Sequence, residues 1–188
     1  MARKSTIHEM SMAFDTYANA FTIINEQHRM VHDGMFFQAS GKQTGWLDGT
    51  EKKFLIVTGD GNYPHIQNML LNFGAGGVDF VAYEDATTSS DGSAMTVQNV
   101  NRASSNTPAC TLFAEPTVTD DGDLIFTLWA PPTATGQGKT ANGVEGIGQG
   151  SEWVLNANSK YLIVMTNNSG GTISWSYEFS WYEIGDDH

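Results

Sequence analysis

The strongest constraint on the fold is an alternating pattern near the end of the chain. Over residues 173–181 the sequence reads Ile, Ser, Trp, Ser, Tyr, Glu, Phe, Ser, Trp, so that five large apolar residues alternate with four polar ones. Successive side chains of a β-strand point to opposite faces, which places all five apolar groups on one face. The pattern predicts a half-buried antiparallel strand over Ile173–Tyr182.

Shorter apolar runs recur along the chain with turn residues between them, and no amphipathic helix of ten residues and no internal repeat competes with them. They predict an all-β fold, a β-sandwich, with a jelly roll as the favoured topology. Asp120–Asp123 predicts a hairpin turn before Leu124, because Asp-Gly accepts a positive φ. Further strands are predicted at Phe21–Asn25, Met35–Ala39, Phe54–Thr58, Ile66–Phe73, Val78–Tyr83, Met95–Val97, Ala109–Ala114, Leu124–Trp129, Trp153–Leu155 and Tyr161–Thr166.

The chain divides into an arm and a single domain. Residues 1–24 contain scattered apolar positions without a period, so we expect an extended N-terminal arm that is ordered only by lying on another surface. Residues 25–188 hold most of the predicted strands and form the β-sandwich domain. Within it, the glycine-rich residues 131–151 predict a long mobile loop.

Composition excludes several classes of partner. Nine Lys and Arg against 21 Asp and Glu give a net charge of −12, which repels phosphate backbones and anionic lipids. We therefore expect no nucleic-acid and no membrane partner. The N-terminus lacks the apolar run of a secretory leader, which favours synthesis in the cytoplasm. Cys110 is the one cysteine, has no basic neighbour in the sequence, and is interpreted as a small buried hydrophobic residue.

Two motifs resemble ligand sites and fail in their context. Gly138-Lys139-Thr140 ends like a phosphate-binding loop, but Thr133 stands where that motif needs glycine. His28 and His32 have the spacing of a zinc site on a helix, whereas along a strand their rings would lie about 13 Å apart. We expect no metal and no cofactor, and a structural or interface role for both histidines.

Two other functions remain open from the residues alone. A β-sandwich glycosidase needs two carboxyl groups about 5–9 Å apart, and Glu152, Glu178 and Glu183 are the candidates, although nothing marks any pair of them. A carbohydrate-binding module needs exposed aromatic rings. The five tryptophans could supply such a platform, but the alternation directs at least Trp175 and Trp181 into the core.

Gln27–Phe37 contains the pattern His-x-x-x-His-[Asp/Glu]-Gly-x-x-Phe. Six further segments follow it in the chain: 73–78, 101–107, 117–123, 148–155, 161–168 and 181–183. Together these segments resemble the head decoration (cement) proteins of tailed bacteriophages, in which they occur in the same order and the first pattern follows an N-terminal arm. They cover most of residues 27–183, whereas residues 1–26 carry no match.

The resemblance implies a structural role without catalytic residues. Members of the family bind the outer surface of an icosahedral head and join neighbouring copies of the major capsid protein. It implies a virion protein made in the host cytoplasm and placed on the outer capsid surface, acting as a homo-oligomer, with a homotrimer favoured and a dimer as the alternative. We expect the capsid or subunit contacts to involve Phe14, Tyr17 and Phe21 of the arm, together with His28 and His32.

Overall fold

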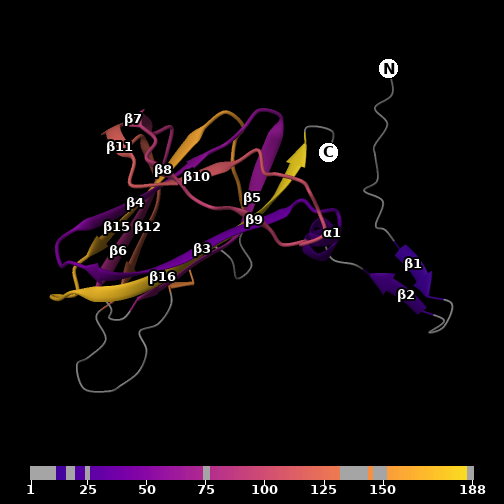
Figure 1. The fold of residues 1–188 in the computed structure, drawn as a ribbon, viewed down its shortest axis with the longest axis horizontal. Coiled ribbons are helices and arrows are strands. Elements are labelled where there is room, and N and C mark those ends of the chain that lie inside the picture. The colour runs from indigo at the N-terminus through magenta and orange to yellow at the C-terminus, as the bar shows by residue number, and fades with distance from the viewer. Residues whose placement is uncertain are drawn as a thin grey trace.

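A computed structural model of the chain describes residues 12–15, 20–23, 26–73, 77–131, 144–145 and 152–185. The prediction of an all-β fold is confirmed, because among these residues a single short helix accompanies the strands (Figure 1). In chain order the elements are β1 (Met12–Asp15), β2 (Ala20–Ile23), α1 (Glu26–His32), β3 (Phe36–Trp46), β4 (Glu51–Val57), β5 (Asn62–Phe73), β6 (Val78–Glu84), β7 (Thr87–Ser90), β8 (Ser93–Ala94), β9 (Gln98–Asn99), β10 (Thr111–Ala114), β11 (Thr117–Asp120), β12 (Asp123–Ala130), β13 (Val144–Glu145), β14 (Trp153–Val154), β15 (Lys160–Asn167) and β16 (Ile173–Gly185).

Two antiparallel sheets form the sandwich. One has the strand order β12-β6-β15-β4-β10-β8, and the other has the order β13-β5-β16-β3-β9 with β14 also paired to β5. Within the described part of both sheets, no strand pairs with the next strand in the chain. The connections therefore cross over between strands, as in the Greek-key arrangements from which jelly rolls are built.

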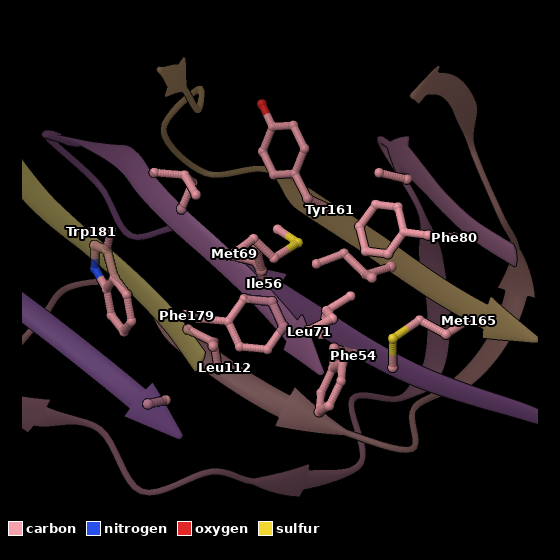
Figure 2. Packing of buried hydrophobic residues seen from close by; sticks show 14 of the residues in the cluster. Phe54, Ile56, Met69, Leu71, Phe80, Leu112, Tyr161, Met165, Phe179 and Trp181 are labelled. Carbon is pink, nitrogen blue, oxygen red and sulfur yellow. The ribbon is translucent and has the colours of Figure 1, made fainter. Parts of the chain in front are cut away.

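The core lies between the two sheets. Large side chains from β4, β5, β15 and β16 meet there, as Figure 2 shows for Phe54, Met69, Met165 and Phe179. The alternation near the C-terminus works as predicted, because Trp175 is 3% exposed and Trp181 is fully buried. Both of these rings face the core, and this part of the sequence analysis is confirmed.

Two similar arches cross the outer face of the first sheet, a repeat that the sequence analysis did not find. The first arch, residues 84–94, joins β6 to β8 through β7, and the second arch, residues 114–124, joins β10 to β12 through β11. Their central strands β7 and β11 pair antiparallel (Figure 1). Beneath them, Leu55, Leu162 and Val164 form a second, smaller core with Ala86.

The predicted hairpin at Asp120–Asp123 is wrong. The Asp-Gly turn is present, with Gly122 at φ 85°, but β11 pairs with β7 whereas β12 pairs with β6. The turn thus carries the chain from the arch back into the sheet. The position of the turn was predicted correctly from its Asp-Gly sequence. The strand with which β12 pairs depends on tertiary packing, which the turn sequence does not reveal.

The predicted strand at Met95–Val97 is also misplaced. These residues lie between β8 and β9, which belong to different sheets, so the chain crosses from one sheet to the other there. Met95 and Val97 nevertheless pack against the core. In the predicted loop 131–151, the short strand β13 pairs with β5, and most of the remaining loop lies outside the described residues.

The predicted arm contains a hairpin where the structure describes it. β1 and β2 pair antiparallel and form a two-stranded sheet of their own, separate from the sandwich sheets (Figure 1). β2 corresponds to the predicted strand Phe21–Asn25, whose last two residues lie outside the described part of the chain. β1 was not predicted, and its Met12 and Phe14 are two of the scattered apolar positions of the arm.

Candidate interaction surface

The helix α1 follows the arm and packs on the end of the second sheet. Its Arg29 bonds to Glu26 one turn earlier and lies 3.2 Å from Asp33 one turn later, spacings that place the three side chains on one helical face. Met30, on another face, is 3% exposed and packs with Phe36 and Tyr182. Burial of this side chain fixes a helix of seven residues that is too short to be stable alone.

The helix brings His28 and His32 together on its exposed face. Their Nε2 atoms are 3.0 Å apart, and their ring centroids are 4.5 Å apart. The separation of about 13 Å expected for a strand is therefore wrong, because the segment is helical. Within the described ranges, no group of three His, Cys, Asp or Glu side chains is arranged to hold a metal ion.

A loop distant in sequence holds the C-terminal end of α1. The Nδ2 groups of three asparagines donate to the carbonyl of the last residue of α1 and to those of the two residues after it. Asn101 donates to the carbonyl of His32 at 3.1 Å, and Asn99 donates to the carbonyl of Gly34 at 2.7 Å. Asn106 is 3.3 Å from the carbonyls of both Asp33 and Gly34.

The helix and this loop form one unit, which we call the helix–loop surface: α1 through Gly34, with residues 99–106. Its two parts overlap residues 27–37 and 101–107, two of the segments quoted above for the expected resemblance to decoration proteins. No contact was predicted for residues 101–107. An Asn- and Ser-rich loop is an unspecific signal, because such residues occur in many turns. The structure supplies the partner that the sequence alone did not reveal.

A polar cluster lies beside the helix–loop surface. The ring of His65 stacks on Tyr182 with centroids 4.6 Å apart, and His65 Nδ1 is 3.0 Å from Glu152 Oε1. The amide of Gln67 donates to the same carboxyl oxygen. Burial, followed by the hydrogen bond to Glu152, raises the pKa of the Tyr182 hydroxyl well above its usual range. The cluster joins β5, β16 and the segment before β14.

The three acidic candidates for glycoside hydrolysis have different surroundings. Glu183 is 2% exposed and accepts hydrogen bonds from the backbone N–H groups of Ala109 and Cys110 and from Trp181 Nε1. These three donors give it a structural role. On β16, Glu183 lies on the core face, whereas Tyr182, the partner of Glu152, lies on the opposite face. Glu178 is half-buried, four residues from Tyr182 along the strand, about 13 Å.

The tryptophans provide little exposed surface. Trp46, Trp175 and Trp181 are buried, and the half-buried Trp153 packs edge-on against Phe126. Trp129 is 57% exposed on β12. Among the tryptophans, all of which the structure describes, Trp129 is therefore the one ring available to a sugar.

The remaining candidates are a buried cysteine, two residues of the β1–β2 hairpin, and residues outside the described part of the chain. Cys110 is 1% exposed, and burial, together with the nearby Glu183, raises the pKa of its thiol, which makes it an unreactive core residue. Phe14 and Phe21 are cross-strand partners in the β1–β2 hairpin. Tyr17 and the segment Gly138-Lys139-Thr140 lie outside the described residues. No helix in the described part of the chain is both long and apolar enough to span a bilayer.

Comparison with known proteins gives no match: no family model, no curated protein and no solved structure is significantly similar to this chain.

Proposed function

We propose that the chain is a structural virion protein that binds the outer surface of a bacteriophage capsid and stabilises it by bridging neighbouring major capsid subunits. The observation that carries this proposal is the helix–loop surface. Two segments that resemble decoration proteins, 27–37 and 101–107, fold against each other through the bonds of Asn101 and Asn106 to the end of α1. Segments kept together in this way are suited to form one contact surface.

The β1–β2 hairpin precedes this surface in the chain. Among the described residues the hairpin is a sheet of its own, so its outer edges are available to pair with another protein. Together with the exposed His28 and His32, it presents two contact regions that are adjacent in the chain. A protein that attaches to two capsid subunits through separate regions gains avidity even when each contact is weak.

The charge and the core fit a protein that is abundant before assembly. A net charge of −12 keeps the free protein soluble and disfavours binding to packaged DNA. The buried carboxyl of Glu183 and the unreactive Cys110 serve the fold, so the described residues support a stable scaffold more directly than a catalytic centre. The proposed partners are the major capsid protein and further copies of the chain itself.

The test is binding to heads of the phage that encodes the chain. Undecorated heads are sedimented with the full chain, with a chain lacking residues 1–24, and with the double variant His28→Ala/His32→Ala. We expect the truncated chain to remain folded, with an unchanged unfolding temperature, and both altered proteins to bind at least tenfold more weakly. Leu47→Ala changes an exposed residue that follows the end of β3 opposite to α1 and should bind like the unaltered chain.

Binding of the truncated and double-variant proteins at full strength would remove the arm and α1 from the contact. If the unaltered chain did not bind the heads at all, the capsid function itself would be wrong.

Carbohydrate binding is the second candidate function, and the exposed ring of Trp129 favours it. Sugars stack on exposed aromatic rings, and such stacking changes tryptophan fluorescence. A glycan that quenches the fluorescence of the unaltered chain but not of Trp129→Phe would support this function over the capsid role. Quenching that persists in Trp129→Phe would show that the glycan does not act on the ring of Trp129.

A further inference from the structure

The strand β12 forms a long unpaired sheet edge in the described part of the molecule. It has eight residues and pairs with β6 along one side, and it stands first in the strand order of its sheet. The strands at the other described ends of the two large sheets, β8, β9 and β13, have two residues each. Along its outer side, β12 therefore offers a row of backbone N–H and C=O groups that can pair with another chain.

The main part of β12 lacks the charged side chains and proline that protect many edge strands, because residues 124–130 contain neither. The charged Asp123 begins the strand, and its register against β6 shifts between Leu124 and Phe126. Phe126, Leu128 and Ala130 pack against the core. The residues that alternate with them are exposed, Ile125 at 38% and Trp129 at 57%, with the exposed Thr127 in the middle. Leu124, before the register shift, is 60% exposed. From Ile125 to Trp129 the outward face of the edge is thus apolar at both ends and uncharged.

The order of these outward residues is self-complementary. If two β12 strands pair antiparallel about a twofold axis at Thr127, Ile125 of each copy lies opposite Trp129 of the other. The two central threonines then face each other, and the inward residues Phe126 and Leu128 also become cross-strand neighbours. Pairs of an aromatic and a β-branched residue are among the favourable cross-strand combinations.

We propose that β12 is the contact between two copies of this chain. The two strands pair antiparallel about Thr127 and join two six-stranded sheets into one continuous sheet across a twofold axis. A second copy fits this edge because residues 124–130 carry no charged side chain, so two chains that each have a net charge of −12 meet there without like charges at the contact. The contact does not depend on capsid binding, and it favours a dimer over the homotrimer expected from the resemblance.

Single cysteines test both the contact and its register. In an antiparallel pair, directly opposite residues have Cα atoms about 4.5 or 5.5 Å apart, within the range that a disulfide spans. Thr127→Cys is therefore expected to form a covalent dimer with itself under mild oxidation. Ile125→Cys and Trp129→Cys should not crosslink alone, since equal residues would lie about 13 Å apart, but a mixture of the two should.

The matched control is Leu47→Cys, which places a thiol at an equally exposed apolar residue, 58% accessible, outside β12. The native Cys110 is buried and should not contribute. Crosslinking of the Leu47 variant as fast as the Thr127 variant would show random collision and overturn the proposal. Crosslinking of Ile125→Cys with itself would overturn the register.

The mass in solution is the second measurement. Light scattering coupled to size exclusion should give twice 20.4 kDa for the unaltered chain. We expect the double variant Ile125→Lys/Trp129→Lys to be monomeric with an unchanged unfolding temperature, and Leu47→Lys to remain dimeric. An unaltered chain that is monomeric or trimeric at high concentration would overturn the proposal. Sedimentation with phage heads then separates the two hypotheses, because a failure of capsid binding leaves the dimer in solution unaffected.

Discussion

Gly34 lies so close to Ser104 that a Cβ at residue 34 would be 2.2 Å from the Ser104 Oγ and 2.6 Å from its Cβ. Gly34 also has a φ of 71°, a conformation that L-residues with a side chain rarely adopt. Residue 34 must therefore lack a side chain for two independent reasons, the positive φ and the close approach of Ser104. It follows the end of α1 and begins the contact with the asparagine loop. The helix–loop surface depends on both.

The first prediction separates these two requirements. Gly34→Ala should lower the free energy of unfolding by about 2–4 kcal/mol, because backbone strain and overpacking add. Ser104→Gly in the same chain should restore the part due to overpacking and leave about 1 kcal/mol of strain. Gly49→Ala measures that strain alone, since Gly49 has the same φ of 71° and no atom within 4 Å of its added Cβ. Urea unfolding of the unaltered chain, Gly34→Ala, Ser104→Gly and the double variant gives the cycle, and additive losses would contradict the close contact.

The second prediction concerns the buried carboxyl of Glu183. Its partners are all donors, so an acceptor-only carboxylate satisfies them, whereas the amide of glutamine would point an N–H group at the N–H of Ala109 or Cys110. Glu183→Gln should therefore destabilise the protein by about 2–4 kcal/mol. Glu178→Gln, on the same strand, should change the stability by less than about 0.5 kcal/mol. Equal effects of the two substitutions on denaturant unfolding would argue against this role.

The third prediction compares two buried indoles. Trp181 Nε1 donates to Glu183 at 3.0 Å, whereas Trp175 Nε1 is buried without a hydrogen-bond partner in the structure. Both Trp→Ala changes should cost about 3–5 kcal/mol. With phenylalanine the two sites should differ, and Trp181→Phe should be the more destabilising by about 1–2 kcal/mol, because the Glu183 carboxyl loses a donor. Thermal unfolding of the two Phe variants measures the difference, and a larger loss at Trp175 would be the contrary result.

The two arches give the fourth prediction. A Cβ on Gly92 would be 2.3 Å from the carbonyl oxygen of Ala114, and one on Gly122 would be 2.0 Å from that of Glu84. Each glycine thus touches the start of the other arch, and each has a positive φ. Gly92→Ala and Gly122→Ala should each cost about 2–4 kcal/mol, more than Gly49→Ala, because the neighbouring atoms are backbone. If either variant lost no more free energy of unfolding than Gly49→Ala in chemical denaturation, the backbone of the arches would be able to move apart at little cost.

The sequence predicted the parts of this fold that depend on local pattern. Alternation identified β16 and placed Trp175 and Trp181 in the core, because a strand that buries one face has an apolar residue at every second position. It did not identify the arches, although residues 84–94 and 114–124 share an Asp-Gly turn at equivalent positions. Their likeness lies in small polar residues and in positive φ at Asp85 and Glu115, which carry no hydrophobic period.

The candidate surface was predicted less completely for the same physical reason. The spacing of His28 and His32 is compatible with a helix or a strand, and a helix of seven residues is stabilised by burying Met30 on residues distant in sequence. The contact with the loop consists of hydrogen bonds from Asn99, Asn101 and Asn106 to a segment about 70 residues earlier. No local sequence pattern predicts such a contact. Long-range contacts of this kind decide which exposed residues become neighbours.

The last prediction concerns acid stability in the first arch. Hydrogen bonds from Lys160, at 2.6 Å, and from Thr88 lower the pKa of the Asp91 carboxyl below its ordinary value of 3.8. The unfolded chain therefore binds a proton more readily, so this contribution to stability is complete above about pH 5 and is lost as the pH falls through the lowered pKa. Because both side chains are about a third exposed, the contribution is below about 1 kcal/mol.

Asp91→Asn should consequently be less stable than the unaltered chain at pH 7 and equally stable near pH 2. Asp121→Asn is the matched control, since Asp121 occupies the equivalent, exposed position of the second arch, and it should differ little from the unaltered chain at either pH. The measurement is urea unfolding of the three proteins from about pH 2 to pH 7. A loss in Asp91→Asn that stays constant over this range would show that the side chain acts through shape and hydrogen bonding without its charge.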